Sequence, residues 1–174
     1  GTSALQIAPT RHLAPPALPM LGHWVQLHVD GEGLHGDLSA HANEALPFLA
    51  DAFALVLLRH ATEVMHPVKR LLAEAARVVA PGGLLALTGL HPLSGWLPWW
   101  WQTRKGKPSL SLPMELEAWL RGADFVIERT QRVGPPWPGG ASQADGSTRL
   151  FGGAYLILAR KRRANATTLR MKPA

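Results

Sequence analysis

Short runs of apolar residues along the chain predict its strands. Leu5–Ala8 predicts a strand that opens the chain, and residues 24–29 alternate apolar with polar side chains before a turn at Asp30-Gly31. Phe53–Leu58 and Leu84–Leu87 are unbroken apolar runs, which are typical of strands buried on both faces of a parallel sheet.

Two more strands are predicted near the end of the chain, at Phe125–Val133 and Leu150–Ala159. A segment rich in proline and glycine, residues 134–146, separates them without a helical pattern. We therefore expect these two strands to be antiparallel neighbours.

Apolar residues recur at helical spacing in two segments. Pro67 suits the start of a helix that runs to Val79 and stops at Pro81-Gly82-Gly83, and Leu112–Arg121 predicts a second helix closed by Gly122. Four prolines between Pro9 and Pro19 argue against a long helix there. Strands that alternate with helices predict an α/β fold with a mainly parallel sheet.

Length and composition fit one globular domain, and the charge is unevenly spread. The 174 residues are 47% apolar and 17% charged, with a formal net charge of +6. Residues 160–174 carry six Lys or Arg residues and no acid, which equals the whole net charge. We therefore predict a neutral α/β domain over residues 1–159 and a basic, flexible tail over residues 160–174.

Several classes of protein are excluded by what the sequence lacks. It has no cysteine, which excludes disulfides and thiolate metal sites, and its eight histidines show no metal-ligand spacing, so we predict no metal site. No apolar run approaches the roughly 20 residues that span a bilayer, and no signal peptide is evident. A cytoplasmic location is the default expectation.

An ordered series of motifs resembles a known enzyme family. Three segments form this series: Leu46-Pro47-Phe48, the run 53–58, and the segment 71–83, which reads LLAEAARVVAPGG. Together they are similar to the class I S-adenosylmethionine-dependent methyltransferases of the type 11 subgroup. Residues 89–96 and 152–162 resemble a narrower bacterial branch of that family. The resemblance implies a Rossmann-like sheet of seven strands that ends in an antiparallel pair, and methyl transfer from S-adenosylmethionine to an unidentified acceptor.

The cofactor loop departs from the family pattern. Family members follow the first strand with a glycine-rich turn that approaches the methionine part of the cofactor. Here Ala8 is followed by Pro9-Thr10-Arg11, with no glycine before Gly22. The resemblance assigns Ala8, Thr10 and Arg11 to this part of the cofactor, and Arg11 is either a ligand of its carboxylate or a solvated loop residue.

The resemblance also assigns the ribose and adenine contacts. Asp30 ends the second strand, where family members place an acid that accepts hydrogen bonds from the ribose hydroxyls, although Asp-Gly also favours a turn by itself. The usual adenine acid falls on Ala42, and the adjacent Asn43 and Glu44 are its candidate substitutes. The chain between Asp30 and Leu46 is too short for the usual helix and strand.

The acceptor side of the site follows from the next two strands. The resemblance places Arg59 and His60 where cofactor and substrate meet, with His60 either a general base or an ordinary loop histidine. Trp96, Trp99, Trp100 and Trp101 follow the fifth strand of the family pattern. They are a flap over the core, a protein-partner surface or a wall of the substrate pocket.

Alternatives to an enzyme stay open. The missing glycines and the tryptophan cluster also fit a catalytically degenerate methyltransferase fold that acts as a binding or scaffold module. The basic tail is either solvated or in contact with phosphates, and no aromatic residue beyond Tyr155 offers base stacking, so we do not expect nucleic-acid binding there. Only Gly1–Ser3 precede the first strand, where the family has a helical segment, so the sequence is a fragment or the protein lacks this cover.

Overall fold

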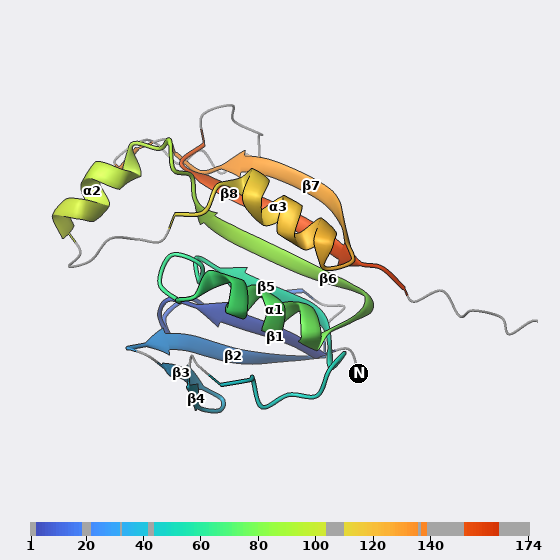
Figure 1. The fold of residues 1–174 in the computed structure, drawn as a ribbon. Helices are drawn as coiled ribbons and strands as arrows, with labels where there is room; N and C mark the ends of the chain where they lie inside the picture. Colours follow the sequence, from blue (N-terminus) through green and yellow to red (C-terminus); the bar gives the residue numbers. More distant parts are fainter. Residues whose placement is uncertain are drawn as a thin grey trace, which may run out of the picture.

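The computed structural model describes residues 3–18, 22–31, 33–41, 44–103, 110–135, 137–138 and 152–163. Within this part of the chain, eight strands form one sheet and three helices are present (Figure 1). The strands are β1 Ser3–Ala8, β2 His23–Asp30, β3 Gly33–Gly36, β4 Ala40–His41, β5 Phe53–Arg59, β6 Val79–Leu90, β7 Phe125–Val133 and β8 Ala154–Lys161. The helices are α1 Val68–Val78, α2 Trp96–Thr103 and α3 Pro113–Gly122.

The strand order explains where a site can form. The order across the sheet is β4-β3-β2-β1-β5-β6-β8-β7. Four consecutive strands in this order are parallel to one another: β2, β1, β5 and β6. β8 lies antiparallel between β6 and β7, which confirms the predicted antiparallel pair. The carboxyl ends of the four parallel strands meet at one edge, the usual place for a ligand in such a sheet.

The expectation of seven strands is wrong for one edge of the sheet. Instead of a helix and a single strand, residues 33–41 form the two short antiparallel strands β3 and β4. The chain before Leu46 is too short for a helical crossover, whereas an antiparallel return needs only a tight turn. Gly31, at a φ of 59°, provides the backbone conformation for that turn.

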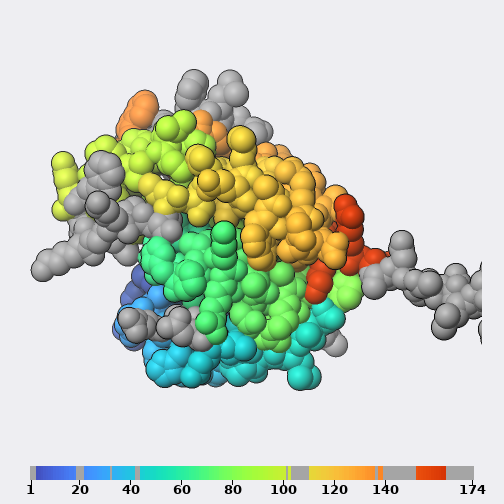
Figure 2. Space-filling view, in the orientation of Figure 1, coloured from blue at the N-terminus to red at the C-terminus, as the bar shows by residue number. Residues whose placement is uncertain are grey.

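Both long helices cover the same face of the sheet. Figures 1 and 2 show α1 and α3 side by side on this face, while α2 projects beyond the end of β6. The larger buried cluster lies under α1 and α3 and includes Leu5, Ile7, Val56, Leu58 and Leu87. The opposite face has a smaller cluster formed by Ala4, Leu55 and Ala86.

Most predicted elements are confirmed, with shifted ends. The helix predicted at Pro67 begins at Val68 with Pro67 as its N-cap, and the second helix spans Pro113–Gly122. β8 continues to Lys161, two residues beyond the predicted end, so the first residues of the basic segment belong to the sheet. No helix in the described residues is long and apolar enough to cross a membrane.

Candidate functional site

His60 stands at the carboxyl end of β5, as the sequence predicts. Its φ of 53° turns the chain sharply out of the strand, and its backbone N–H donates to the Thr88 carbonyl of β6 at 2.9 Å. The side chain is 34% exposed, and its Nδ1 lies 3.2 Å from Oε1 of Glu63. The ring is thus fixed by a carboxylate and still accessible from solvent.

Glu63 is a site residue that the sequence analysis does not identify. Its side chain is only 3% exposed, its Oε1 accepts the backbone N–H of Leu90, and its Oε2 accepts the Thr62 hydroxyl at 3.3 Å. The available signal was a single acid in the otherwise mostly apolar stretch 61–65. A buried carboxylate needs such donors, since an unpaired one would be strongly destabilising.

Glu63 determines which ring nitrogen of His60 carries the proton. An ionised carboxylate only accepts hydrogen bonds, so Nδ1 of the neutral ring must donate. Nε2 is then unprotonated and available as a proton acceptor, which is the state that a general base requires.

Tyr155 of β8 completes the buried polar group around Glu63. Burial, reinforced by the negative charge of Glu63, raises the pKa of the Tyr155 hydroxyl far above its usual value. Tyr155 also hydrogen-bonds with Thr62, which in turn donates to Glu63. The phenol therefore keeps its proton and adds no negative charge beside Glu63.

A second group of predicted residues lies at the end of β1. Ala8, Thr10 and Arg11 line a hollow of about 180 Å³ together with Gln6. The Gln6 residue is 1% exposed; its Nε2 donates to the Leu13 carbonyl at 2.5 Å, and its Oε1 has no hydrogen-bond partner among the described residues. This residue was missed, although an amide in the middle of the apolar run Leu5–Ala8 was the signal.

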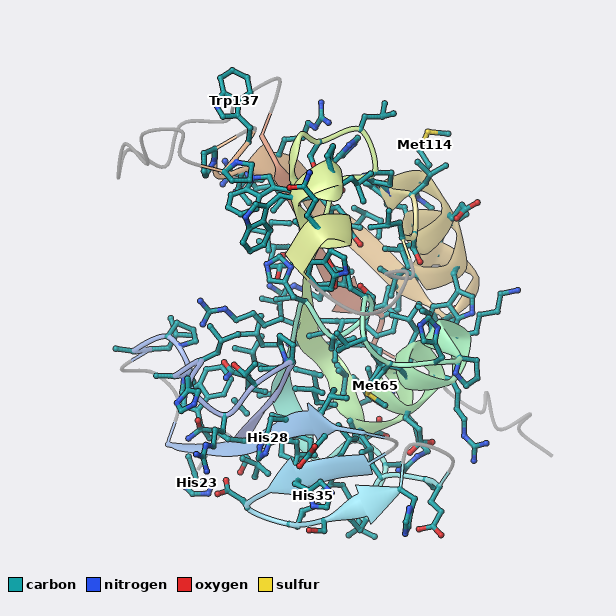
Figure 3. The ribbon with its side chains drawn as sticks, turned by 90° about the vertical axis from the view of Figure 1, so that its left-hand side faces the viewer. His23, His28, His35, Met65, Met114 and Trp137 are labelled. Atoms are coloured by element: carbon teal, nitrogen blue, oxygen red, sulfur yellow. The ribbon has the colours of Figure 1, made fainter. Side chains whose placement is uncertain are left out.

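Asp30 and Glu44 line a different hollow, of about 440 Å³, beside the β3–β4 edge. His35 and His41 are also part of its lining. Figure 3 shows His28 and His35 close together on the β2–β3 hairpin, with ring centroids 6.4 Å apart. The described structure therefore divides the predicted cofactor residues between two hollows, and Asn43 lies outside the described residues.

Arg59, the last residue of β5, faces the chain that follows β1. Its Nη1 donates to the carbonyl of Ala14 at 3.1 Å. With the Gln6–Leu13 bond, this contact holds the segment after β1 against the ends of β1 and β5. Its predicted contact with a cofactor stays a prediction.

The tryptophan cluster forms α2, beyond the end of β6. Trp96 and Trp99 pack edge to face, with ring centroids 5.6 Å apart, and Trp96 Nε1 donates to the Pro135 carbonyl at 2.8 Å. Trp99 is 43% exposed and Trp100 is half-buried, whereas the side chain of Trp101 lies outside the described residues. In the described residues, no group of three or more His, Asp or Glu side chains is arranged to hold a metal ion.

Comparisons with known proteins agree with this architecture. Residues 21–87 match a family model described as a methyltransferase domain. A S-adenosylmethionine-dependent methyltransferase from Archaeoglobus fulgidus has a TM-score of 0.65 at 15% identity, over 92% of this chain and 86% of that one.

A Thermotoga maritima structure, described as a possible histamine N-methyltransferase, has a TM-score of 0.62 at 16% identity, over 93% of this chain and 83% of that one. The cyclase SpnF has a TM-score of 0.58 at 16% identity, over 94% and 76% of the two chains. No curated protein is significantly similar in sequence.

The strand order with its antiparallel β8 and the structural neighbours define the Rossmann-like α/β fold of S-adenosylmethionine-dependent methyltransferases. The methyltransferase-domain model matches residues 21–87, which is less than half of the chain, and the sequence lacks the glycine-rich turn after β1. SpnF is described as a cyclase, so this fold alone does not specify methyl transfer.

Proposed function

We propose that the chain transfers a methyl group from S-adenosylmethionine to an acceptor that has yet to be identified. The observation that carries this proposal is the His60–Glu63 pair at the carboxyl end of β5, in a chain with the methyltransferase fold. A protein partner at the tryptophan cluster and the cytoplasmic location remain predictions from the sequence.

The residues at the end of β1 fit the amino-acid part of this cofactor. The free Oε1 of Gln6 is a buried acceptor suited to an ammonium group, and the exposed Arg11 on the same hollow is suited to a carboxylate. Asp30 would accept hydrogen bonds from ribose hydroxyls, and Glu44 lines the same hollow. When bound, the cofactor supplies a methyl group that is already activated.

The protein's own contribution is to orient the acceptor and to take up its proton. Nε2 of His60, at the carboxyl end of β5, would accept this proton, and Glu63 would keep Nε2 unprotonated by holding the ring proton on Nδ1. Proximity and orientation then account for much of the rate enhancement, because the methyl donor needs no further activation.

Isothermal titration with S-adenosylmethionine, and with its demethylated product, tests this proposal. We expect saturable binding, and about tenfold weaker binding for Arg11→Gln, because the variant loses a charge-assisted hydrogen bond. Arg70→Gln removes the same charge from an exposed position on α1 and should bind normally. A folded protein that gives no heat with millimolar ligand would contradict the proposal.

A second candidate function is a degenerate methyltransferase fold that binds a protein partner. The exposed apolar side chains beyond β6 favour it, since Leu93 is 83% exposed and Trp99 43% exposed. Trp99→Ala should then lose a partner that Met114→Ala retains, because Met114 is an even more exposed apolar side chain, at 79%, but lies on α3. A protein that stays monomeric and binds S-adenosylmethionine saturably would count against this alternative.

A further inference from the structure

The carboxylate beside His60 belongs to a hydrogen-bond network that reaches three strands. Oε1 of Glu63 lies 3.2 Å from Nδ1 of His60 and accepts the backbone N–H of Leu90, the last residue of β6. Oε2 accepts the hydroxyl of Thr62 at 3.3 Å, and Thr62 is in turn hydrogen-bonded with Tyr155 of β8. Tyr155 is thus connected with His60, at the end of β5, through two intervening side chains.

The chemistry of these groups gives each hydrogen bond in the network one direction. An ionised carboxylate only accepts hydrogen bonds, so Thr62 donates its single hydroxyl proton to Glu63. The Thr62 oxygen then accepts from Tyr155, whose phenol keeps its proton because burial raises its pKa. The proton on Nδ1 of His60 points to the same carboxylate from the other side.

The groups that support His60 are shielded from water. Thr62 is 1% exposed, Tyr155 is 2% exposed, and the side chain of Glu63 is 3% exposed. Water cannot readily replace a donor that is lost at such a place, and a buried oxygen without a donor is costly. A carboxylate that loses a donor there takes up a proton more readily.

Protonation of Glu63 would reverse its hydrogen bond with His60. A neutral carboxyl group has a hydroxyl proton to donate, and Nδ1 of the ring would accept it. The ring proton would then lie on Nε2, which could no longer take a proton from a methyl acceptor. The state of the His60 ring therefore depends on the donors that Glu63 receives.

We propose that Thr62 and Tyr155 are positioning residues that act through Glu63 and hold His60 in the tautomer of a general base. This inference rests on the proposed methyl transfer, in which Nε2 of His60 takes the proton of the acceptor. Thr62 supplies the donor that keeps Glu63 an acceptor only. Tyr155 donates to the Thr62 oxygen and so directs the Thr62 hydroxyl proton to Glu63.

Two substitutions at position 62 separate a hydrogen-bonding role from a packing role. Thr62→Val keeps the branched shape and loses the hydroxyl, whereas Thr62→Ser keeps the hydroxyl and loses a methyl group. We expect Thr62→Val to lose the Nδ1–H tautomer of His60 and Thr62→Ser to retain it. If Thr62 only fills space, Thr62→Val is the closer match to the wild type, and that order would overturn the proposal.

Nitrogen-15 NMR of the imidazole rings measures the tautomers in the free protein, without cofactor or acceptor. His60→Gln identifies the signals of His60, and the wild type should show Nδ1–H as the dominant form near neutral pH. Thr130→Val is the matched control and should leave His60 unchanged, because the Thr130 hydroxyl donates to Glu117 in an exposed pair between β7 and α3. A wild-type His60 ring with Nε2–H, or with averaged tautomers, would also overturn the proposal.

Tyr155→Phe tests the far end of the network without a change at position 62. It removes only the phenolic oxygen, and it should shift the His60 tautomer in the same direction as Thr62→Val. The shift should be smaller, because Thr62 keeps its own hydroxyl. If Thr62→Val does not fold, Tyr155→Phe decides, and an unchanged His60 ring in this variant would overturn the proposal.

Titration of the wild type with S-adenosylmethionine separates failure of this inference from failure of the proposed function. A wild type that binds no cofactor would refute methyl transfer, and the two variants at position 62 would still decide whether the network fixes the His60 ring. Cofactor binding by the wild type, with an unchanged His60 tautomer in Thr62→Val, would support methyl transfer and refute the network.

Discussion

Tyr155 and Gly89 face each other across the β6–β8 pair, and the residue register makes them direct neighbours. A Cβ atom at Gly89 would overlap the hydroxyl end of the Tyr155 ring, which is 2% exposed and cannot move aside freely. The absence of a side chain at position 89 therefore allows Tyr155 to lie beside Thr62 and Glu63.

Gly89→Ala should lower the free energy of unfolding by about 1–3 kcal/mol, because it overpacks a closely packed site. Gly122→Ala is the matched control: it ends α3, and an added Cβ would meet no atom within 4 Å. The control should change stability by less than about 0.5 kcal/mol. Urea unfolding compares them, and equal midpoints would contradict this interpretation.

Single site residues could be predicted only in part. The family resemblance assigns His60 to the site, and the apolar run before it predicts the buried strand β5 that His60 follows. Gln6 and Glu63 were missed because hydrophobic patterning identifies which positions are buried but not which polar group has its partners there. Their roles depend on contacts with Leu13, Leu90 and Thr62, which only the folded chain brings within reach.

At the scale of elements, α1 has a role beyond covering the sheet. Arg77 of α1 donates to the carbonyls of Phe48 and Leu46 at 2.8 and 2.9 Å, and Glu74 accepts the N–H of Leu46 at 2.7 Å. The helix therefore anchors the Leu46-Pro47-Phe48 segment, which lies within the residues that match the methyltransferase-domain model.

The Glu74–Arg77 pair predicts a dependence of stability on pH. The hydrogen bond from Arg77 is the largest influence and lowers the pKa of Glu74, although burial opposes it. A carboxyl whose pKa is lowered by folding adds stability above its unfolded pKa and loses it as the pH falls through its folded pKa. The stabilisation is therefore present near neutral pH and lost below about pH 4.

Glu74→Gln should consequently lose less stability than the wild type as the pH falls from about 4 to about 2, whereas the two should stay parallel between neutral pH and about pH 5. Glu115→Gln, at an exposed position of α3, should follow the wild-type curve. Urea midpoints across this pH range measure the difference. Parallel curves for wild type and Glu74→Gln would show that the pair does not contribute.

Elements with strong periodicity were predictable, and the edge of the sheet was not. The spacing of Leu71, Leu72, Ala75 and Val78 specifies one helical face, and all four are buried. Residues 33–41 form strands too short for alternation to be detected, and their pairing depends on the turn after Asp30. The sequence indicated only that a helix would not fit there.

For the whole molecule, the last strand ties together distant parts of the chain. Lys161 Nζ contacts Oδ1 of Asp51 at 2.8 Å and the carbonyls of Ala76 and Val79 at 2.9 and 2.7 Å, at the carboxyl end of α1. A cation is favourable at this end of a helix. Arg160 pairs with Glu128 of β7 and donates to the Gly82 carbonyl.

Two truncations separate the sheet from the basic tail. Ending the chain after Ala159 removes these contacts and should lower the free energy of unfolding by about 2 kcal/mol or more, given about 1 kcal/mol for each net hydrogen bond. Ending it after Arg163 keeps them and should leave stability near that of the full chain. Thermal unfolding of both proteins measures this, and equal losses would contradict it.

The distribution of charge along the sequence predicts a separate basic tail, but it does not predict where this tail joins the domain. Six basic residues follow Ala159, yet Arg160 and Lys161 are part of β8 and use their side chains to hold the domain together. Net charge describes how a segment meets solvent and partners, and it carries no information on strand pairing.

The central position of β8 also constrains folding during synthesis. Of the described strands it leaves the ribosome last, yet it pairs with both β6 and β7. Until then those strands expose unpaired backbone edges, which can join with other nascent chains. The domain can complete its sheet only after translation has passed residue 161, so a ribosome that stalls shortly before this point holds an aggregation-prone intermediate.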